Sequence, residues 1–368
     1  MNVLFHCVYF PPEVGGLESH VYYLARALVN RGHRVQVVTS RSLPGVPKEE
    51  DMDGIQVVRT WFPSRSPSGW IAHSLGSIPQ TRALAREADV IHAQAFASIL
   101  PAAAGRIGSG APLVATFHTS HFLTRAERPA WRPILRRLAQ MPDYSLAASE
   151  EIAKVAMDLA PEVKVEALAN GVDTTFFHRV EPALPPGGRL RIVVPRRLFP
   201  KNGVEYFIRA FPLILKEMDA EAVLIGDGPE MERLQALSED LGISSGISFL
   251  GKRAHSEMPG LLSSGDLAVI PSLMEATSVA ALEAMACELP VVASNVGGLP
   301  EIVGEEVGGL FEPGNPDALA AAVLRVVEQG DLPRKGALAR ARVDERWSNE
   351  RLADRHLEIY SDLLQRRG

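Results

Sequence analysis

Two glutamates eight positions apart are the residues of this chain best suited to hold a polyhydroxylated ligand. Glu275 follows an apolar run at 266–270, and Glu283 lies inside a helical pattern that begins near Ser278. Eight residues span a little over two helical turns, so the spacing predicts that both carboxylates share one side of the element. Each carboxylate can accept hydrogen bonds from a pair of hydroxyls, and the helix N-terminus between them offers N–H groups to a phosphate. The segment therefore predicts a nucleotide-sugar site.

A basic segment supplies the complementary charge. In the sequence PRRLFPKNG at 195–203, Arg197 and Lys201 precede a glycine and follow a strand expected at 190–194. Arginine can bind a diphosphate through two hydrogen bonds, and lysine adds a point charge. A neutralised diphosphate is also a better leaving group. A solvated basic loop is the alternative interpretation.

A histidine lies where a parallel sheet presents its ligands. His118 follows the strand expected at 113–117, and the carboxyl ends of such strands line the binding crevice. It could hydrogen-bond a substrate hydroxyl or steady a transferring group, whereas a structural hydrogen bond is the alternative. His92 ends the preceding strand in the same way, and we interpret it as structural. A zinc site from His92, His118 and His121 is disfavoured by the lack of a nearby cysteine or a helical His-x3-His pair.

Glycine turns at strand ends carry weaker signals. Gly15 and Gly16 separate the first strand from the first helix, where backbone N–H groups could approach a phosphate. No Gly-x-Gly-x-x-Gly is present, which argues against a dehydrogenase. Gly226 ends one strand of the second half and Arg253 follows the next, so both are expected near the nucleotide.

Short β-branched runs alternate with helical patterns along the whole chain. This alternation predicts parallel sheets with crossover helices, and it restarts after the loop-forming sequence PALPPGG at 182–188. We therefore expect an α/β protein with two doubly wound, Rossmann-like domains facing each other across a cleft. The first spans residues 1–172 on the acceptor side, and the second spans 173–349 on the donor side. An amphipathic last helix, at about 350–368, is expected to cross back to the first domain.

Composition limits the classes of function. The chain has 368 residues, is 46% hydrophobic and 22% charged, and carries a formal net charge of −6, which argues against a nucleic-acid binder. Its two cysteines, Cys7 and Cys287, stand in apolar surroundings, as buried thiols do in a reducing compartment. The N-terminus lacks the basic region of a signal peptide, and no apolar run reaches the length of a membrane span. These features predict a cytoplasmic protein.

A basic segment at Arg125–Arg137 includes five arginines and Trp131. Such a segment could contact the anionic lipids at the inner face of the cell membrane, or it could bind an acidic acceptor. A solvated charged face is the alternative interpretation.

Taken in order, the motifs resemble those of a known family. They are Pro11–Glu18, Thr116–His118, Asn170–Asp173, Arg197–Gly203, Gly226–Pro229, Glu275–Ala286, Pro290–Ser294 and Gly297–Glu301. The chain is similar, over nearly its whole length, to retaining glycosyltransferases of the GT-B fold in glycosyl group 1 (family 4). The resemblance implies transfer of a hexose-type sugar from a UDP or GDP type of donor to an acceptor hydroxyl. It implies no cofactor and no metal, and it leaves the acceptor and the oligomeric state open.

The resemblance also implies a role for particular residues. His118 and Glu275 would face the donor sugar at the reaction centre, and Glu283 would bind the ribose hydroxyls. The remaining donor-binding positions would be Gly16, Arg197, Lys201, Asn202, Gly226, Arg253, Thr277, Ser278 and Val279. Retention would proceed by same-face attack, with the leaving phosphate accepting the acceptor's proton.

Two departures from the family pattern stand in the donor half. The family usually has lysine immediately before the glycine at 203, where this chain has Asn202, and we expect Lys201 to take over the diphosphate contact. Members often carry Gly-Phe-Gly after the first glutamate, where this chain has Ala276, Thr277 and Ser278, a change expected to narrow the pocket and alter donor choice.

Other functions on a similar scaffold are a nucleotide-sugar epimerase, a phosphorylase, and a non-catalytic nucleotide-binding scaffold. A pyridoxal phosphate phosphorylase would need a cofactor lysine, and none stands out. The substitution at Asn202 is the main support for a scaffold.

Overall fold

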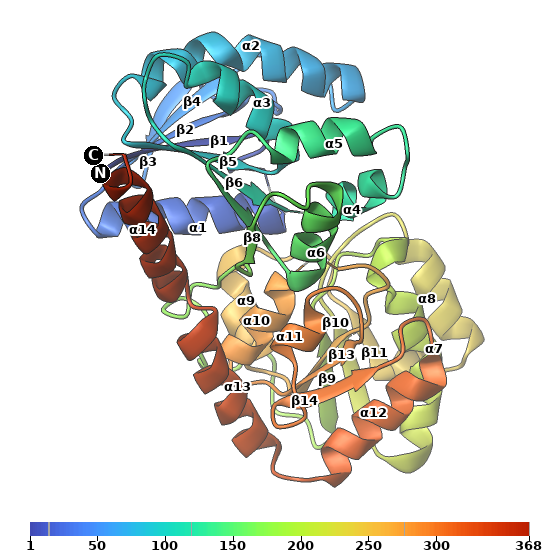
Figure 1. The fold of residues 1–368 in the computed structure, drawn as a ribbon. Coiled ribbons are helices and arrows are strands. Elements are labelled where there is room, and N and C mark those ends of the chain that lie inside the picture. Colours follow the sequence, from blue (N-terminus) through green and yellow to red (C-terminus); the bar gives the residue numbers. More distant parts are fainter. Residues whose placement is uncertain (14, 119, 276, 368) are drawn as a thin grey trace. The chain divides into compact units, whose positions relative to one another are not determined.

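The computed structural model describes residues 1–13, 15–118, 120–275 and 277–367, which form two compact units. The N-terminal unit comprises Met1–Asn170 together with Asn349–Gly368, and the C-terminal unit comprises Gly171–Ser348. Both chain ends therefore belong to the N-terminal unit (Figure 1).

The N-terminal unit is built on an eight-stranded sheet of order β3-β4-β2-β1-β5-β6-β7-β8. Its strands are β1 Asn2–Cys7, β2 Arg34–Ser40, β3 Glu49–Met52, β4 Ile55–Thr60, β5 Val90–Gln94, β6 Leu113–Phe117, β7 Tyr144–Ala147 and β8 Val165–Ala167. All neighbours run parallel except β3, which pairs with β4 in the antiparallel sense. The strand order reverses between β1 and β5, so their carboxyl ends flank the crevice where such sheets bind ligands.

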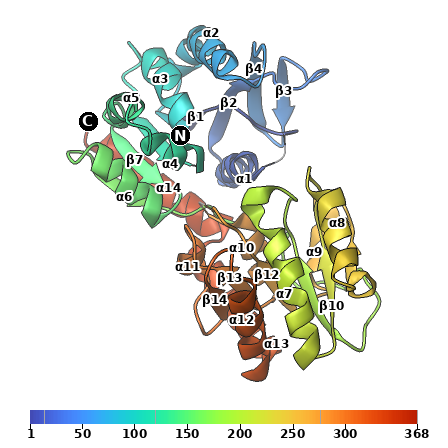
Figure 2. The same cartoon turned by 90° about the vertical axis from the view of Figure 1, so that its right-hand side faces the viewer.

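Helices cover both faces of this sheet. They are α1 Gly16–Asn30, α2 Pro67–Ala85, α3 Phe96–Gly105, α4 Ser120–Ala126, α5 Arg132–Ala139, α6 Glu150–Leu159 and α14 Asn349–Gln365. Figures 1 and 2 show α1 on one face and α2 with α3 on the other. The last helix α14 packs against α1 and buries Tyr360 in the same core as the β1 side chains. Arg31 ties the two helices together by donating to Asp354 at 3.0 Å.

The C-terminal unit is built on a six-stranded, wholly parallel sheet of order β11-β10-β9-β12-β13-β14. Its strands are β9 Leu190–Val194, β10 Ala220–Leu224, β11 Ile247–Phe249, β12 Leu267–Ile270, β13 Val291–Ser294 and β14 Gly308–Phe311. Numbered within the unit, the order is 3-2-1-4-5-6, the doubly wound arrangement of dinucleotide-binding folds. The strand order reverses between β9 and β12, although both strands run in the same direction. Ligands of such sheets bind beyond the carboxyl ends of the two strands at this point.

The helices of this unit also form two layers. They are α7 Val204–Glu217, α8 Met231–Asp240, α9 Met258–Leu262, α10 Val279–Ala286, α11 Leu299–Ile302, α12 Pro316–Glu328 and α13 Leu332–Arg346, with 3-10 turns η1 Pro200–Asn202, η2 Ser244–Gly246 and η3 His255–Glu257. Helices α7 and α12 pack together over one buried core, and α10 packs with α13 on the other face of the sheet (Figure 1).

The predicted fold class is confirmed by these two parallel-stranded α/β units and by the last helix that joins the first of them. Two strands were not predicted. Glu49–Met52 (β3) is acidic and pairs only at the sheet edge, and Val165–Ala167 (β8) is only three residues long. Neither carries the apolar, β-branched run on which the prediction rested.

Candidate donor-binding site

The loops that carry the predicted donor residues leave neighbouring strands. Strands β9 and β12 are paired in register, with Ile192 opposite Leu267 and Val193 opposite Ala268. Their exits therefore emerge together at the point where the sheet order reverses. The backbone N–H of Leu273 donates to the carbonyl of Lys201 at 2.8 Å, so the two loops are also joined to each other.

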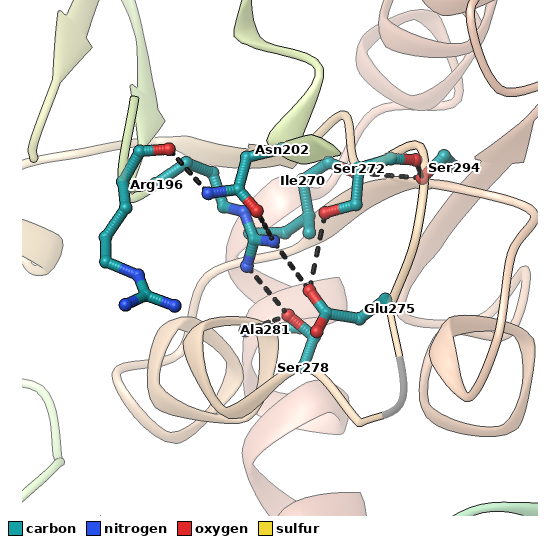
Figure 3. Close-up of polar contacts among 9 residues, drawn as sticks. Arg196, Asn202, Ile270, Ser272, Glu275, Ser278, Ala281 and Ser294 are labelled. Carbon is teal, nitrogen blue, oxygen red and sulfur yellow. Dashed lines mark hydrogen bonds and ion pairs between the residues drawn. The ribbon is translucent and has the colours of Figure 1, made fainter. Parts of the chain in front are cut away.

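Glu275 is held at this point by Arg196. Nη2 of Arg196 donates to Oε2 of Glu275 at 2.6 Å and to Oδ1 of Asn202 at 3.0 Å (Figure 3). Both charged side chains are largely buried, with 10% of Arg196 and 17% of Glu275 exposed. The Ser272 hydroxyl lies 3.4 Å from the same carboxylate oxygen, and Ser294 donates to the Ser272 carbonyl. The carboxylate is thus fixed from two sides before any ligand arrives.

Three residues of the predicted basic segment have distinct surroundings. Arg197 is exposed, and its guanidinium lies over the Phe199 ring at 5.7 Å. Lys201 is exposed, and its pKa is lowered by partial burial, with Glu275 opposing the shift. Asn202 is 4% exposed, and its Nδ2 donates to the carbonyl of Arg197 at 2.6 Å. Both ends of the Asn202 amide therefore have partners within the loop.

Two glycines let neighbouring loops approach the backbones of Arg196 and Glu275 closely. Gly226 has a φ of +149°, and a Cβ there would collide with the carbonyl oxygen of Arg196. Gly297 has a φ of +53°, and a Cβ there would collide with the carbonyl oxygen of Glu275. The structure thus gives Gly226 a packing role beside the site, where only glycine can stand.

The helix between the two predicted glutamates begins where the sequence predicted. Helix α10 starts at Val279, and the hydroxyl of Ser278 caps it by accepting from the N–H of Ala281 at 3.3 Å. Glu275 lies in the preceding loop and Glu283 inside the helix, as predicted, so the helical spacing does not by itself set the direction of the Glu275 carboxylate. Ala276 lies outside the described residues.

The start of α10 nevertheless suits an anion. The first turn of a helix offers unpaired N–H groups and the positive end of the dipole, and here Thr277 and Ser278 lead into it as buried residues. Glu283 lies within α10 as a partly exposed residue, but its carboxyl is desolvated, and this desolvation raises its pKa to about 8.

The region expected to lie near the nucleotide is formed by the neighbouring strand ends. The N–H of Gly226 donates to the carbonyl of Gly251 at 3.0 Å, which joins the exits of β10 and β11. Arg253 follows this junction as an exposed side chain, 3.8 Å from Glu257.

The N-terminal unit holds the remaining predicted residues. Gly16 is the exposed first residue of α1, at the exit of β1. His118 follows β6 and is buried, and its Nε2 hydrogen-bonds Oε1 of Gln94 at the end of β5. Burial, with a smaller effect of His356, lowers the pKa of His118 to about 3, so the ring is neutral. Because Nε2 donates to the amide oxygen, Nδ1 is a lone-pair acceptor, and it is buried without a partner among the described residues.

His92 has the structural role predicted for it. Its Nδ1 hydrogen-bonds Tyr360 of α14 and its Nε2 hydrogen-bonds Thr116, both at 2.7 Å. Both ring nitrogens are therefore occupied, which excludes His92 from a zinc site with His118 and His121. Within the described ranges, no cluster of three or more histidine, cysteine or acidic side chains could hold a metal ion.

Two models of known protein families match the chain and distinguish a glycosyltransferase from the alternative functions. The model of Glycosyltransferase Family 4 matches residues 14–176, and that of Glycosyl transferases group 1 matches residues 178–339. The chain belongs to family 4 of the glycosyltransferases. It is a nucleotide-sugar-dependent hexosyltransferase, which sets aside the epimerase, the phosphorylase and the non-catalytic scaffold.

Relatives match this transferase over nearly its full length. An uncharacterized glycosyltransferase of Methanocaldococcus jannaschii is 29% identical, covering 98% of this chain and 97% of its own. The GDP-mannose-dependent alpha-(1-6)-phosphatidylinositol monomannoside mannosyltransferase of Mycobacterium tuberculosis is 28% identical over 94% of each chain. Sucrose-phosphate synthase of Thermosynechococcus elongatus shares the fold, with a TM-score of 0.85 at 20% identity and 99% coverage of both chains. Anabaena HepE, solved with UDP-glucose, shares it with a TM-score of 0.76 at 21% identity, over 98% of this chain and 100% of its own.

The sequence prediction counted Arg196 among the cations of this loop but assigned no role to it. Arg196 and Arg197 are adjacent, and the sequence offers no way to tell which of two neighbouring arginines turns inward. Leu198, the next residue, is buried, which fits a strand-like alternation of inward and outward side chains. The decisive observation is the ion pair between Arg196 and Glu275, which joins the loops after two neighbouring strands. Gln94 was also missed, because one glutamine at a strand end has no distinctive pattern.

Proposed function

We propose that the transferase moves a hexose from a UDP- or GDP-sugar to an acceptor hydroxyl with retention of anomeric configuration. The observation that carries this proposal is the fixed Glu275 carboxylate, which stands where the sheet order reverses and directly before the N-terminus of α10. A sugar held by this carboxylate would have its diphosphate beside a helix N-terminus and a set of cations.

Each part of the donor would contact the protein groups that suit its chemistry. Glu275 accepts hydrogen bonds from sugar hydroxyls, and Glu283 binds the ribose. Cationic side chains and the α10 N-terminus neutralise the diphosphate as the glycosidic bond breaks, which stabilises the leaving group. The leaving phosphate oxygen then takes the proton of the attacking hydroxyl on the same face of the sugar, so no protein nucleophile is required.

His118 would face the donor sugar as a neutral ring. Its Nδ1 can accept a hydrogen bond from a hydroxyl once a ligand reaches it, and Gln94 keeps the tautomer that leaves Nδ1 unprotonated. Loss of this orientation should lower turnover more than donor affinity.

The acceptor side belongs to the N-terminal unit. A polar concavity of about 450 Å³ in this unit is lined by Phe62 and the loop residues 41–46. No described helix is long and apolar enough to cross a membrane. We propose peripheral contact with an anionic lipid surface through the basic segment Arg125–Arg137, of which Arg132 and Arg136 already pair with Asp158 and Glu162.

The test is a screen of UDP- and GDP-sugars for stabilisation and for release of nucleoside diphosphate. A donor at about 100 times its Kd should raise the free energy of unfolding by ~2.7 kcal/mol. With a donor in hand, Glu275→Gln should lower kcat with little change in nucleotide affinity, whereas the exposed Glu239→Gln serves as the control. Parental turnover in both Glu275→Ala and His118→Ala would refute the site.

A further inference from the structure

Arg340 joins the C-terminal end of α10 to the segment with which the chain enters the C-terminal unit. Its Nη1 donates to the carbonyl of Ala286, the last residue of α10, at 2.8 Å and to the carbonyl of Phe177 at 2.7 Å. Its Nη2 donates to the carbonyl of Thr174 at 2.9 Å, and its Nε donates to Asp344 at 2.7 Å. One guanidinium group thus holds together two segments that are far apart in sequence.

Helix α13, which carries Arg340, packs against the end of α10 (Figure 1). A Cβ at Gly336, one turn before Arg340, would collide with the carbonyl oxygen of Glu288, just beyond α10. Positions four residues apart share one face of a helix, so the same face of α13 meets this end of α10 twice. A cation here also suits the helix dipole, whose negative end lies at the C-terminus.

The segment 174–177 that Arg340 holds is a turn closed by its own hydrogen bonds. Oδ1 of Asp173 accepts from the N–H groups of Thr175 and Phe176 at 3.0 and 3.1 Å. The turn follows closely after Gly171, the first residue of the C-terminal unit. Its N–H groups therefore face their own cap, whereas two of its carbonyls face the guanidinium.

The same turn also contacts the element that follows Arg253. The ring of Phe176 stacks on that of His255 in η3, with centroids 5.2 Å apart and an interplanar angle of 7°. Arg253 is expected near the nucleotide, and Ala286 ends the helix that carries Glu283. The turn thus lies between the supports of two residues assigned to the nucleotide.

We propose that Arg340 is a positioning residue for nucleotide binding by this transferase. It fixes the end of α10 to the turn 174–177, so that α10, the turn and η3 respond to the nucleotide together. The inference rests on the proposed function, because that function assigns the ribose and the diphosphate to α10. Coupling free energies are reciprocal, so a nucleotide that orders α10 also orders the turn. The turn lies at the end of α10 opposite to Ser278, so this effect requires no contact with the diphosphate.

Hydrogen exchange of the parent protein, with UDP and GDP as probes, tests this coupling. The N–H groups of Thr175 and Phe176 exchange when the turn opens. A saturating nucleoside diphosphate should slow the exchange of the peptide that covers them by about 2- to 30-fold, the range of such coupling energies. In Arg340→Gln the slowing should disappear. Parental exchange that is unchanged by a bound diphosphate would overturn the inference.

Calorimetry with the same probes supplies a second readout. Arg340→Gln should weaken diphosphate binding by about 2- to 30-fold. Arg342→Gln is the matched control, because both arginines lie on α13 with 23% and 24% of their side chains exposed. Arg342 donates instead to the carbonyls of Glu301 and Ile302. Its variant should lose similar stability but keep the parental affinity and exchange. Equal losses of affinity in the two variants would trace the effect to stability alone and overturn the inference.

Two further variants separate charge from geometry. Asp344→Asn removes the carboxylate beside Arg340 but leaves the three carbonyl bonds, so affinity should stay within about twofold of the parent. If Arg340→Gln does not fold, Arg340→Lys keeps the charge but cannot reproduce the planar set of hydrogen bonds. It should also lose the slowing of exchange, and parental slowing in this variant would overturn the inference.

The outcomes also separate this inference from the function on which it rests. A parent that binds UDP or GDP, with an Arg340→Gln variant that matches it in affinity and exchange, overturns only the role of Arg340. If the parent binds neither nucleotide and turns over no nucleotide sugar, the proposed function itself has failed.

Discussion

Nε2 of His118 lies 2.7 Å from Oε1 of Gln94, so the ends of the paired strands β6 and β5 are joined by one buried hydrogen bond. The bond fixes the orientation of a ring that sequence analysis could place only at the end of its strand. It also leaves Nδ1 as the ring nitrogen without a hydrogen-bond partner among the described residues.

Gln94→Leu should destabilise the N-terminal unit and slow turnover. The variant leaves the Nε2–H donor buried without an acceptor, which costs about 1–3 kcal/mol. Chemical denaturation measures the first effect, and kcat with a cognate donor measures the second. Ser98→Ala, at a buried hydroxyl in α3 without a partner among the described residues, is the control and should leave both nearly unchanged. Unaltered stability in Gln94→Leu would show that the hydrogen bond is not made in solution.

Nucleotide affinity should rise with pH between about 7 and 9. The pKa of Glu283 is raised to about 8 by burial, so its proton must leave before a carboxylate can accept hydrogen bonds from ribose hydroxyls. Below that pKa, affinity should increase by up to about tenfold per pH unit. Calorimetry across this range checks the slope, and Glu283→Gln should bind more weakly and without the slope. A parent whose affinity is flat from pH 7 to 9 would contradict the role of Glu283.

Acid should destabilise the protein well before its carboxylates titrate. His118 and His356 are buried, with pKa values lowered to about 3 and about 4, whereas the unfolded chain takes up these protons near pH 6.5. As the pH falls below 6.5, the unfolded state binds more protons than the folded state, so the free energy of unfolding decreases. Each such histidine contributes up to ~1.4 kcal/mol per pH unit until its folded pKa is reached.

Urea denaturation between pH 7 and 4.5 measures this loss. His356→Gln removes one titrating ring and should give a shallower dependence, whereas a variant at the less buried His255 should keep a slope near that of the parent. Equal stability at pH 7 and pH 5 would show that these rings are accessible to protons in the folded protein.

Gly297→Ala should impair catalysis beyond its cost in backbone strain. A left-handed conformation costs a non-glycine residue about 1–2 kcal/mol, and here the new Cβ would also push against the carbonyl of Glu275. Gly330 has a φ of +71° with open space around it, so Gly330→Ala carries the strain alone. We expect greater thermal destabilisation in Gly297→Ala, which adds the clash to the strain, and a kcat loss only in that variant. Comparable kcat in both would show that the backbone of Glu275 tolerates displacement.

Vesicle binding should depend on particular arginines of the basic segment Arg125–Arg137. Arg132 and Arg136 pair with Asp158 and Glu162, whereas Arg128 and Arg137 are exposed and have no acidic partner in the described part of the chain. A basic residue near an anionic surface contributes about 1 kcal/mol, so Arg128→Gln with Arg137→Gln should weaken binding by more than about tenfold. Cosedimentation with anionic vesicles measures it. The double variant Arg132→Gln with Arg136→Gln should lose less, and equal losses would argue against the pairing.

The sequence by itself determined the alternation of strands and helices, the strand ends at which Glu275 and His118 stand, and the return of the last helix. These features follow from local periodicity and turn composition, which each segment carries independently of the rest. It did not reveal β3, whose acidic residues pair only with a neighbouring strand.

Only the tertiary structure decided which arginine faces inward, how Asn202 is used, and which groups hold the Glu275 carboxylate. Side-chain directions in these loops depend on contacts between the exits of β9 and β12, which are far apart in sequence and adjacent only through the strand order. A buried charge turns toward the partner that compensates its desolvation. For Arg196 that partner is Glu275, 79 residues further along the chain.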